Sequence, residues 1–87
     1  MVRDNDYVAV FNSIHRVMKA EKVLKELRLP ILLIPAPRSL AADCGLAIRY
    51  GAGDREMVEG ALAEAGLSPE VIYVRLDDEY LRVGTPL

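Results

Sequence analysis

Residues 7–37 read YVAVFNSIHRVMKAEKVLKELRLPILLIPAP, and three predicted elements follow one another in this stretch. Tyr7 to Phe11 is rich in β-branched and aromatic residues, which is typical of a strand. From Ile14 to Arg28, apolar residues recur every three or four positions, which predicts a helix that buries one face. Pro30 ends this helix because proline lacks a backbone N–H. The apolar face of the predicted helix consists of Ile14, Val17, Met18, Leu24 and Leu27.

The rest of the chain continues this alternation of strands and helices. Ile31–Ile34 predicts a second strand, Leu46–Tyr50 a third and Val71–Leu76 a fourth, and a second helix that Gly66 ends precedes the fourth strand. The order β-α-β-β-α-β is typical of the ferredoxin-like arrangement, in which two helices cover one face of a four-stranded antiparallel sheet. The sequence therefore predicts an α+β fold, and residues 1–87 are expected to form a single domain. Glu79–Val83 offers a short additional edge strand.

The second face of this predicted sheet raises a packing problem. Both helices lie on the first face, yet the run Ile31–Ile34 has no polar alternation to suit water. A homodimer that buries the second face would resolve the conflict.

Charge is unevenly distributed along the chain. Residues 1–49 hold eight basic and five acidic residues, whereas residues 50–87 hold three basic and eight acidic residues. The two halves either attract each other or present opposite signs to a partner.

Composition excludes several classes of function. One cysteine and one histidine allow neither an internal disulfide nor a structural zinc site, so a reducing compartment, the cytoplasm, is expected. The longest apolar run, Leu29 to Ala36, is far shorter than the ~20 residues of a membrane helix, and the N-terminus carries no export signal. A pI of about 5.3 argues against a nucleic-acid partner.

The predicted topology places the lone cysteine, Cys44, near the start of a helix. In the strand order 4-1-3-2, the third strand is antiparallel to the first, so its start lies beside the end of the first strand. Cys44 and Gly45 are therefore expected next to Ser13, a candidate N-cap of the first helix. Arg38 belongs to the loop that precedes Cys44, and His15 lies in the first turn of the helix.

Such a position suits a reactive thiol. The thiolate is the nucleophilic form of cysteine, and a helix N-terminus and a nearby arginine both favour the charged form. Gly45 leaves room for a partner's sulfur, and His15 is a candidate to orient or protonate Cys44. A single thiol without a resolving cysteine fits a carried sulfur, a persulfide, better than disulfide exchange.

A structural role for Cys44 is equally open. Cys44 alternates in step with Leu46, Ile48 and Tyr50, the expected core face of the third strand, and free cysteine often acts as a small buried hydrophobe. The function would then be that of a non-catalytic, ferredoxin-like interaction or regulatory module that dimerises through its sheet. An RNA-binding module, in which tyrosines stack on bases, is disfavoured by the acidic balance of the chain.

Two motifs around Cys44 resemble those of a known family. Residues 34–38 read Ile-Pro-Ala-Pro-Arg, and residues 43–49 read Asp-Cys-Gly-Leu-Ala-Ile-Arg. A strand that ends in Phe11, followed by Ser13-Ile-His15, precedes them. In these motifs the chain resembles the selenium/sulfur (Se/S) carrier protein-like family, and the resemblance covers residues 7–76.

The resemblance implies that Cys44 carries sulfur or selenium as a persulfide or perselenide, without a metal or a separate cofactor. It implies further that Cys44 and Gly45 form the reactive pair, and that Pro35, Pro37 and Arg38 shape the loop. The protein is then expected to be a carrier rather than a stand-alone enzyme. It would receive the chalcogen from a cysteine desulfurase or another donor and pass it to an acceptor enzyme.

Overall fold

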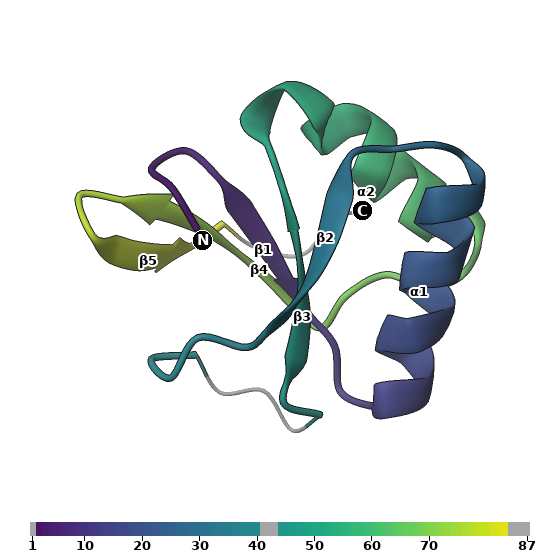
Figure 1. Ribbon diagram of the computed structural model, residues 1–87, viewed down its shortest axis with the longest axis horizontal. Helices are drawn as coiled ribbons and strands as arrows, with labels where there is room; N and C mark the ends of the chain where they lie inside the picture. Colours follow the sequence, from purple (N-terminus) through teal and green to yellow (C-terminus); the bar gives the residue numbers. More distant parts are fainter. Residues whose placement is uncertain (1, 41–43, 84–87) are drawn as a thin grey trace.

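The computed structural model describes residues 2–40 and 44–83, which form a sheet with helices on one side of it (Figure 1). The five strands of the sheet are β1 (Tyr7–Val10), β2 (Ile31–Pro35), β3 (Leu46–Tyr50), β4 (Val71–Leu76) and β5 (Glu79–Arg82). The helical layer contains α1 (Ile14–Glu26) and α2 (Arg55–Glu64), and a short 3₁₀ helix, η1 (Ala52–Asp54), leads into α2.

The strand order is β2-β3-β1-β4-β5, and all neighbouring strands are antiparallel. The predicted α+β class, with two helices and an antiparallel sheet, is confirmed, whereas the prediction of four strands is wrong. The first four strands stand in the expected order, and β5 extends the sheet beside β4 through a two-residue turn at Asp77 and Asp78. Both turn residues have positive φ angles, 51° and 65°, as a tight hairpin requires. Because this turn lacks the usual glycine, the sequence signal for β5 is weak.

The helices bury one face of the sheet, but the buried stripe of α1 is narrower than its apolar pattern predicts. Val17, Ala20 and Leu24 of α1 are fully buried, whereas Ile14, Met18 and Leu27 of the predicted face are exposed. The buried stripe of α1 packs together with Val58 and Leu62 of α2 against the sheet. The residues that they meet there are Ala9, Ile48, Tyr50 and Ile72 of the strands and Phe11, which directly follows β1.

The second face of the sheet is also buried, within the single chain. Its cluster of buried side chains comprises Val8, Val10, Ile34, Ala47 and Val71 from the strands, joined by Val2 and Leu40 from outside the sheet. Val2 returns over the sheet because residues 3–6 form a turn, in which the N–H of Asp6 donates to the carbonyl of Arg3 at 3.0 Å. Within β2, Leu32 remains 44 % exposed. The exposure that motivated a homodimer is therefore largely removed by the chain itself, and the homodimer stays a prediction.

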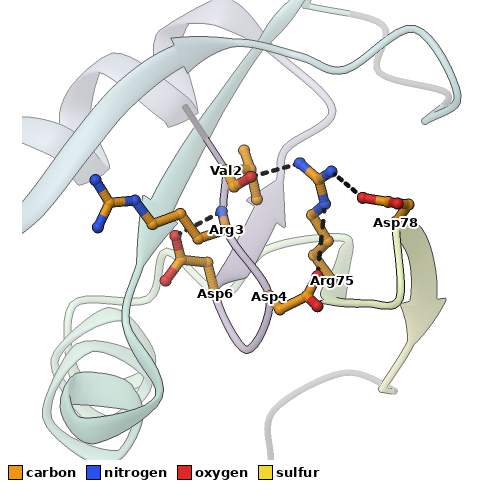
Figure 2. A network of polar contacts seen from close by, with 6 residues as sticks. All are labelled: Val2, Arg3, Asp4, Asp6, Arg75 and Asp78. Atoms are coloured by element: carbon orange, nitrogen blue, oxygen red, sulfur yellow. Dashed lines mark hydrogen bonds and ion pairs between the residues drawn. The ribbon is translucent and has the colours of Figure 1, made fainter.

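Polar contacts of Arg75 hold the N-terminal turn against the β4–β5 hairpin (Figure 2). The guanidinium donates from Nη1 to the carbonyl oxygen of Val2 and from Nη2 to Oδ1 of Asp78 at 2.8 Å. Its Nε lies 3.9 Å from Oδ1 of Asp4. One arginine on β4 thus joins segments from both ends of the described chain and keeps Val2 over the second face.

A buried tyrosine links β3 to α2. Tyr50 is 0 % exposed, and its hydroxyl donates to Oε2 of Glu59 at 2.8 Å. The same carboxylate oxygen accepts a hydrogen bond from Nε of Arg55 at 2.8 Å, and the ring of Tyr7 stacks on that of Tyr50. Burial, together with the hydrogen bond to the Glu59 carboxylate, raises the pKa of Tyr50 well above its ordinary value.

Replacing this tyrosine, Tyr50→Phe, is expected to reduce the loss of stability at alkaline pH. Tyrosine in an unfolded chain titrates near pH ~10, whereas folded Tyr50 keeps its proton above that pH. Below the pKa of tyrosine in the unfolded state, Tyr50 makes its full contribution to the free energy of unfolding. Above that pKa, the free energy of unfolding falls as the pH rises, by up to about 1.4 kcal/mol per pH unit. Urea unfolding above pH ~10 checks this difference in slope. Parallel pH profiles for the two proteins would contradict it.

Candidate functional site

Cys44 lies two residues before β3, and β3 starts at the end of the molecule where α1 begins (Figure 1). Its side chain is partly buried and packs against the core under the helices. The thiol sulfur lies within hydrogen-bond distance of two carbonyl oxygens, that of Phe11 at 3.5 Å and that of Leu46 at 3.2 Å, and its one proton can be donated to either. Since Phe11 directly follows β1, the first contact joins the start of β3 to the end of β1, as the predicted strand order requires.

The surroundings of the thiol combine features of both sequence interpretations. Cys44 contacts the core side of the sheet, as its alternation with Leu46 predicts, yet it retains access to solvent. A carbonyl oxygen accepts a hydrogen bond from S–H but has no proton to donate to an anionic sulfur. Because the thiolate is the reactive form, the side chain must give up both carbonyl contacts when it attacks.

Ser13 caps α1 close to this point. Its backbone is extended, with φ −151° and ψ 149°, and its side-chain oxygen accepts the N–H of Arg16 at 3.1 Å. The first turn of α1 contains no acidic residue, so no carboxylate there offsets the positive end of the helix dipole. Phe11, whose carbonyl accepts the hydrogen bond of Cys44, lies two residues before this cap.

Gly45 leaves open space on one side of Cys44. Its φ of +73° lies in the left-handed region, and a Cβ added to it would meet no atom within 4 Å. The backbone conformation, rather than crowding, therefore requires glycine. The Gly45 carbonyl accepts the N–H of Ala36 at 2.9 Å, which ties the start of β3 to the segment after β2. An approaching group thus meets an exposed glycine beside the thiol.

The other predicted site residues belong to the segments around this end of the sheet, and none of them is a hydrogen-bond partner of the sulfur within the described residues. Pro35 ends β2 and is exposed, and Pro37 in the following loop is partly buried. Arg38 and His15 are exposed, and among the described residues neither forms a hydrogen bond with Cys44. The favourable charge expected from Arg38, and the orienting role expected of His15, therefore remain predictions.

The thiol keeps partial exposure to solvent. Two hollows of the described surface measure about 320 and 330 Å³, one beside Tyr73 and Tyr80 and the other beside Val23 and Leu27, and Cys44 lines neither. Asp43, which precedes Cys44 in the motif, lies outside the described residues.

Two further features bear on the nature of the site. Residues 2–40 and 44–83 contain no group of three or more His, Cys, Asp or Glu side chains that could hold a metal ion. Within the same residues, neither helix has the length and apolar character that crossing a membrane requires.

Sequence reasoning missed two residues near the site, Ile14 and Met18, by assigning them to the buried face of the helix. Both are exposed on α1. The sequence held no clear signal for this exposure, because Leu24, which is fully buried, is likewise followed by a lysine.

Comparison with known proteins gives one match. The model of the family described as "Putative Se/S carrier protein-like" matches residues 6–74, a range that includes Cys44 and runs from the start of β1 into β4. No curated protein and no solved structure shows significant similarity to the chain.

Proposed function

Because the chain belongs to the Se/S carrier protein-like family, we propose that it carries sulfur or selenium on Cys44 as a persulfide or perselenide. One observation carries the proposal: the only cysteine of the chain is a partly exposed thiol beside an open, left-handed glycine. That thiol lies within the region that the family model matches. The residues proposed to shape or assist the site are Gly45, Arg38, Ser13, His15, Pro35 and Pro37.

Loading is a transfer of one sulfur atom between two cysteines. The Cys44 thiolate attacks the terminal sulfur of a persulfide on the donor protein and forms a new S–S bond. The S–S bond of the donor breaks, and its electron pair leaves with the donor's cysteine sulfur as a thiolate. One S–S bond forms as one breaks, so the exchange involves no net oxidation, and the donor's thiolate regains the proton that Cys44 released to solvent. A cysteine desulfurase is the proposed class of donor, and delivery to an acceptor enzyme repeats the same exchange.

The lone thiol suits transport of a persulfide. In a chain with one cysteine, no second thiol can attack the loaded sulfur from within the same molecule. Release of the sulfur therefore requires a thiol from another molecule, such as that of the acceptor. A reducing compartment such as the cytoplasm fits this proposal, because it keeps a free thiol from forming disulfides.

A second candidate function is that of a non-catalytic interaction or regulatory module in which Cys44 is structural. The contacts of the thiol with two backbone carbonyls, and its packing against the core, favour this alternative. Free cysteine commonly fills such positions as a small apolar residue.

Reaction with a mild thiol reagent separates the two functions. We expect Ellman's reagent to modify the native protein at Cys44 without denaturant, because the thiol is partly exposed and Gly45 leaves space beside it. Absorbance of the released aromatic thiol and the intact mass measure the reaction. Incubation with a cysteine desulfurase and cysteine is then expected to add one sulfur atom. Modification that begins only when urea unfolds the protein would favour the structural role.

A further inference from the structure

Helix α1 exposes an apolar pair close to Cys44. Ile14 and Met18 are 46 % and 45 % exposed, although Val17 between them is fully buried. They are four positions apart, so their side chains are neighbours on one side of the helix. Two adjacent exposed aliphatic side chains form a small apolar patch that water solvates poorly.

The patch lies within reach of any protein that binds at Cys44. The carbonyl of Phe11 holds the thiol, and the three residues from Phe11 to Ile14 span at most about 11 Å. Met18 is four helical residues further, which adds about 6 Å along the axis. A typical interface buries about 800 Å² of each partner, equivalent to a disc of about 16 Å radius. A protein centred over the thiol therefore also covers Ile14 at the start of α1, and an interface shifted slightly along the helix includes Met18.

Positive charge accompanies this patch. Helix α1 contains four basic and two acidic residues, and Glu21 is already paired with Lys25 at 3.3 Å. Lys19 and Lys22 follow Met18 and form no ion pair with the residues that the structure describes. Helix α2 has the opposite balance, with one arginine and three glutamates. Charge complementarity thus favours an acidic partner on the α1 side of the molecule.

We propose that the start of α1 docks the protein that loads Cys44, and that this donor presents an apolar spot with acidic residues around it. The inference rests on the proposed carrier function. Ile14 and Met18 form the apolar centre of the docking surface, and the flexible thioether of Met18 adapts readily to a partner's shape. Lys19 and Lys22 form a basic rim, which speeds association with an acidic surface more than it tightens binding.

The substitution Met18→Glu tests the docking surface, and Met57→Glu is its matched control. Met57 is 65 % exposed on α2, so the control makes the same chemical change on the other helix. The donor is a cysteine desulfurase from the same organism, supplied with cysteine, and the intact mass follows sulfur addition to Cys44. Inorganic polysulfide serves as a second sulfur source, because a small anion loads a thiol without docking. Thermal unfolding confirms that both variants fold.

We expect Met18→Glu to slow loading by the desulfurase at least about tenfold, a typical effect of disrupting an interface centre. Loading by polysulfide is expected to match that of the wild type, and Met57→Glu is expected to leave both rates unchanged. Desulfurase-dependent loading of Met18→Glu at the wild-type rate overturns the docking proposal. The proposal is also overturned if Met57→Glu slows loading by the desulfurase equally, or if Met18→Glu slows loading from both sulfur sources. The same holds if wild-type protein is loaded by polysulfide but not by the desulfurase. If neither source adds sulfur to wild-type Cys44, the carrier function itself fails.

Discussion

Cys44→Ser is expected to abolish sulfur loading while the protein remains folded. The chain has one cysteine, so this substitution removes every thiol that can hold a persulfide. A serine hydroxyl can donate to the carbonyl of Phe11 or Leu46 as the thiol does, so we expect stability to change by less than about 1 kcal/mol. The measurement is the intact mass after incubation with a cysteine desulfurase and cysteine.

Wild-type protein alkylated at Cys44 provides a chemical control for this variant, because it blocks the same atom without changing the sequence. Both samples are expected to gain no sulfur, whereas untreated wild type gains one atom. Sulfur addition to folded Cys44→Ser would show that another group accepts it, and the assignment of Cys44 as the carrier residue would be lost.

Phe11→Ala is expected to lower the free energy of unfolding by about 3–5 kcal/mol. The ring of Phe11 is 1 % exposed and packs in the core between the sheet and the helices. Removal of a buried ring costs its transfer free energy and leaves a cavity. Small domains have only about 5–15 kcal/mol of stability, so the loss is a large part of the total. Chemical denaturation at low temperature measures it.

Two further variants keep this prediction interpretable. Phe11→Leu retains most of the apolar volume and is expected to lose clearly less stability than Phe11→Ala, so it remains measurable if the alanine variant does not fold. Met57→Ala removes an exposed side chain and is expected to change stability by no more than about 0.5 kcal/mol. Equal losses from Phe11→Ala and Met57→Ala would contradict the placement of Phe11 in the core.

Local patterns were sufficient for most of the secondary structure. The strands around Val8, Leu33, Ile48 and Tyr73 were predictable from their short apolar and β-branched runs, and both helices from their periodicity. The family resemblance was also readable, and the match to residues 6–74 confirms it. The fifth strand was not predictable with the same clarity, because its turn depends on two aspartates in left-handed conformations, which aspartate tolerates but does not specify.

The covering of the second face shows why burial was harder to predict. The run Ile31–Ile34 indicated correctly that apolar side chains needed cover on that face, but not what supplied it. Val2 and Leu40, far apart in the sequence, provide part of that cover. No periodicity marks two isolated residues in irregular segments, so a homodimer was the simplest cover that the sequence suggested.

By itself, the sequence determined the order of the elements, the α+β class and the family, because these depend on local periodicity and short motifs. It also singled out Cys44 as the only thiol. Only the tertiary structure decided the state of that thiol, which is held by the carbonyls of Phe11 and Leu46, half-buried against the core and open on the side of Gly45. It also decided that Ile14 and Met18 face solvent. The physical reason is that the exposure and hydrogen bonding of a side chain depend on which distant segments pack against it, and these are set by the pairing of the strands and the docking of the helices.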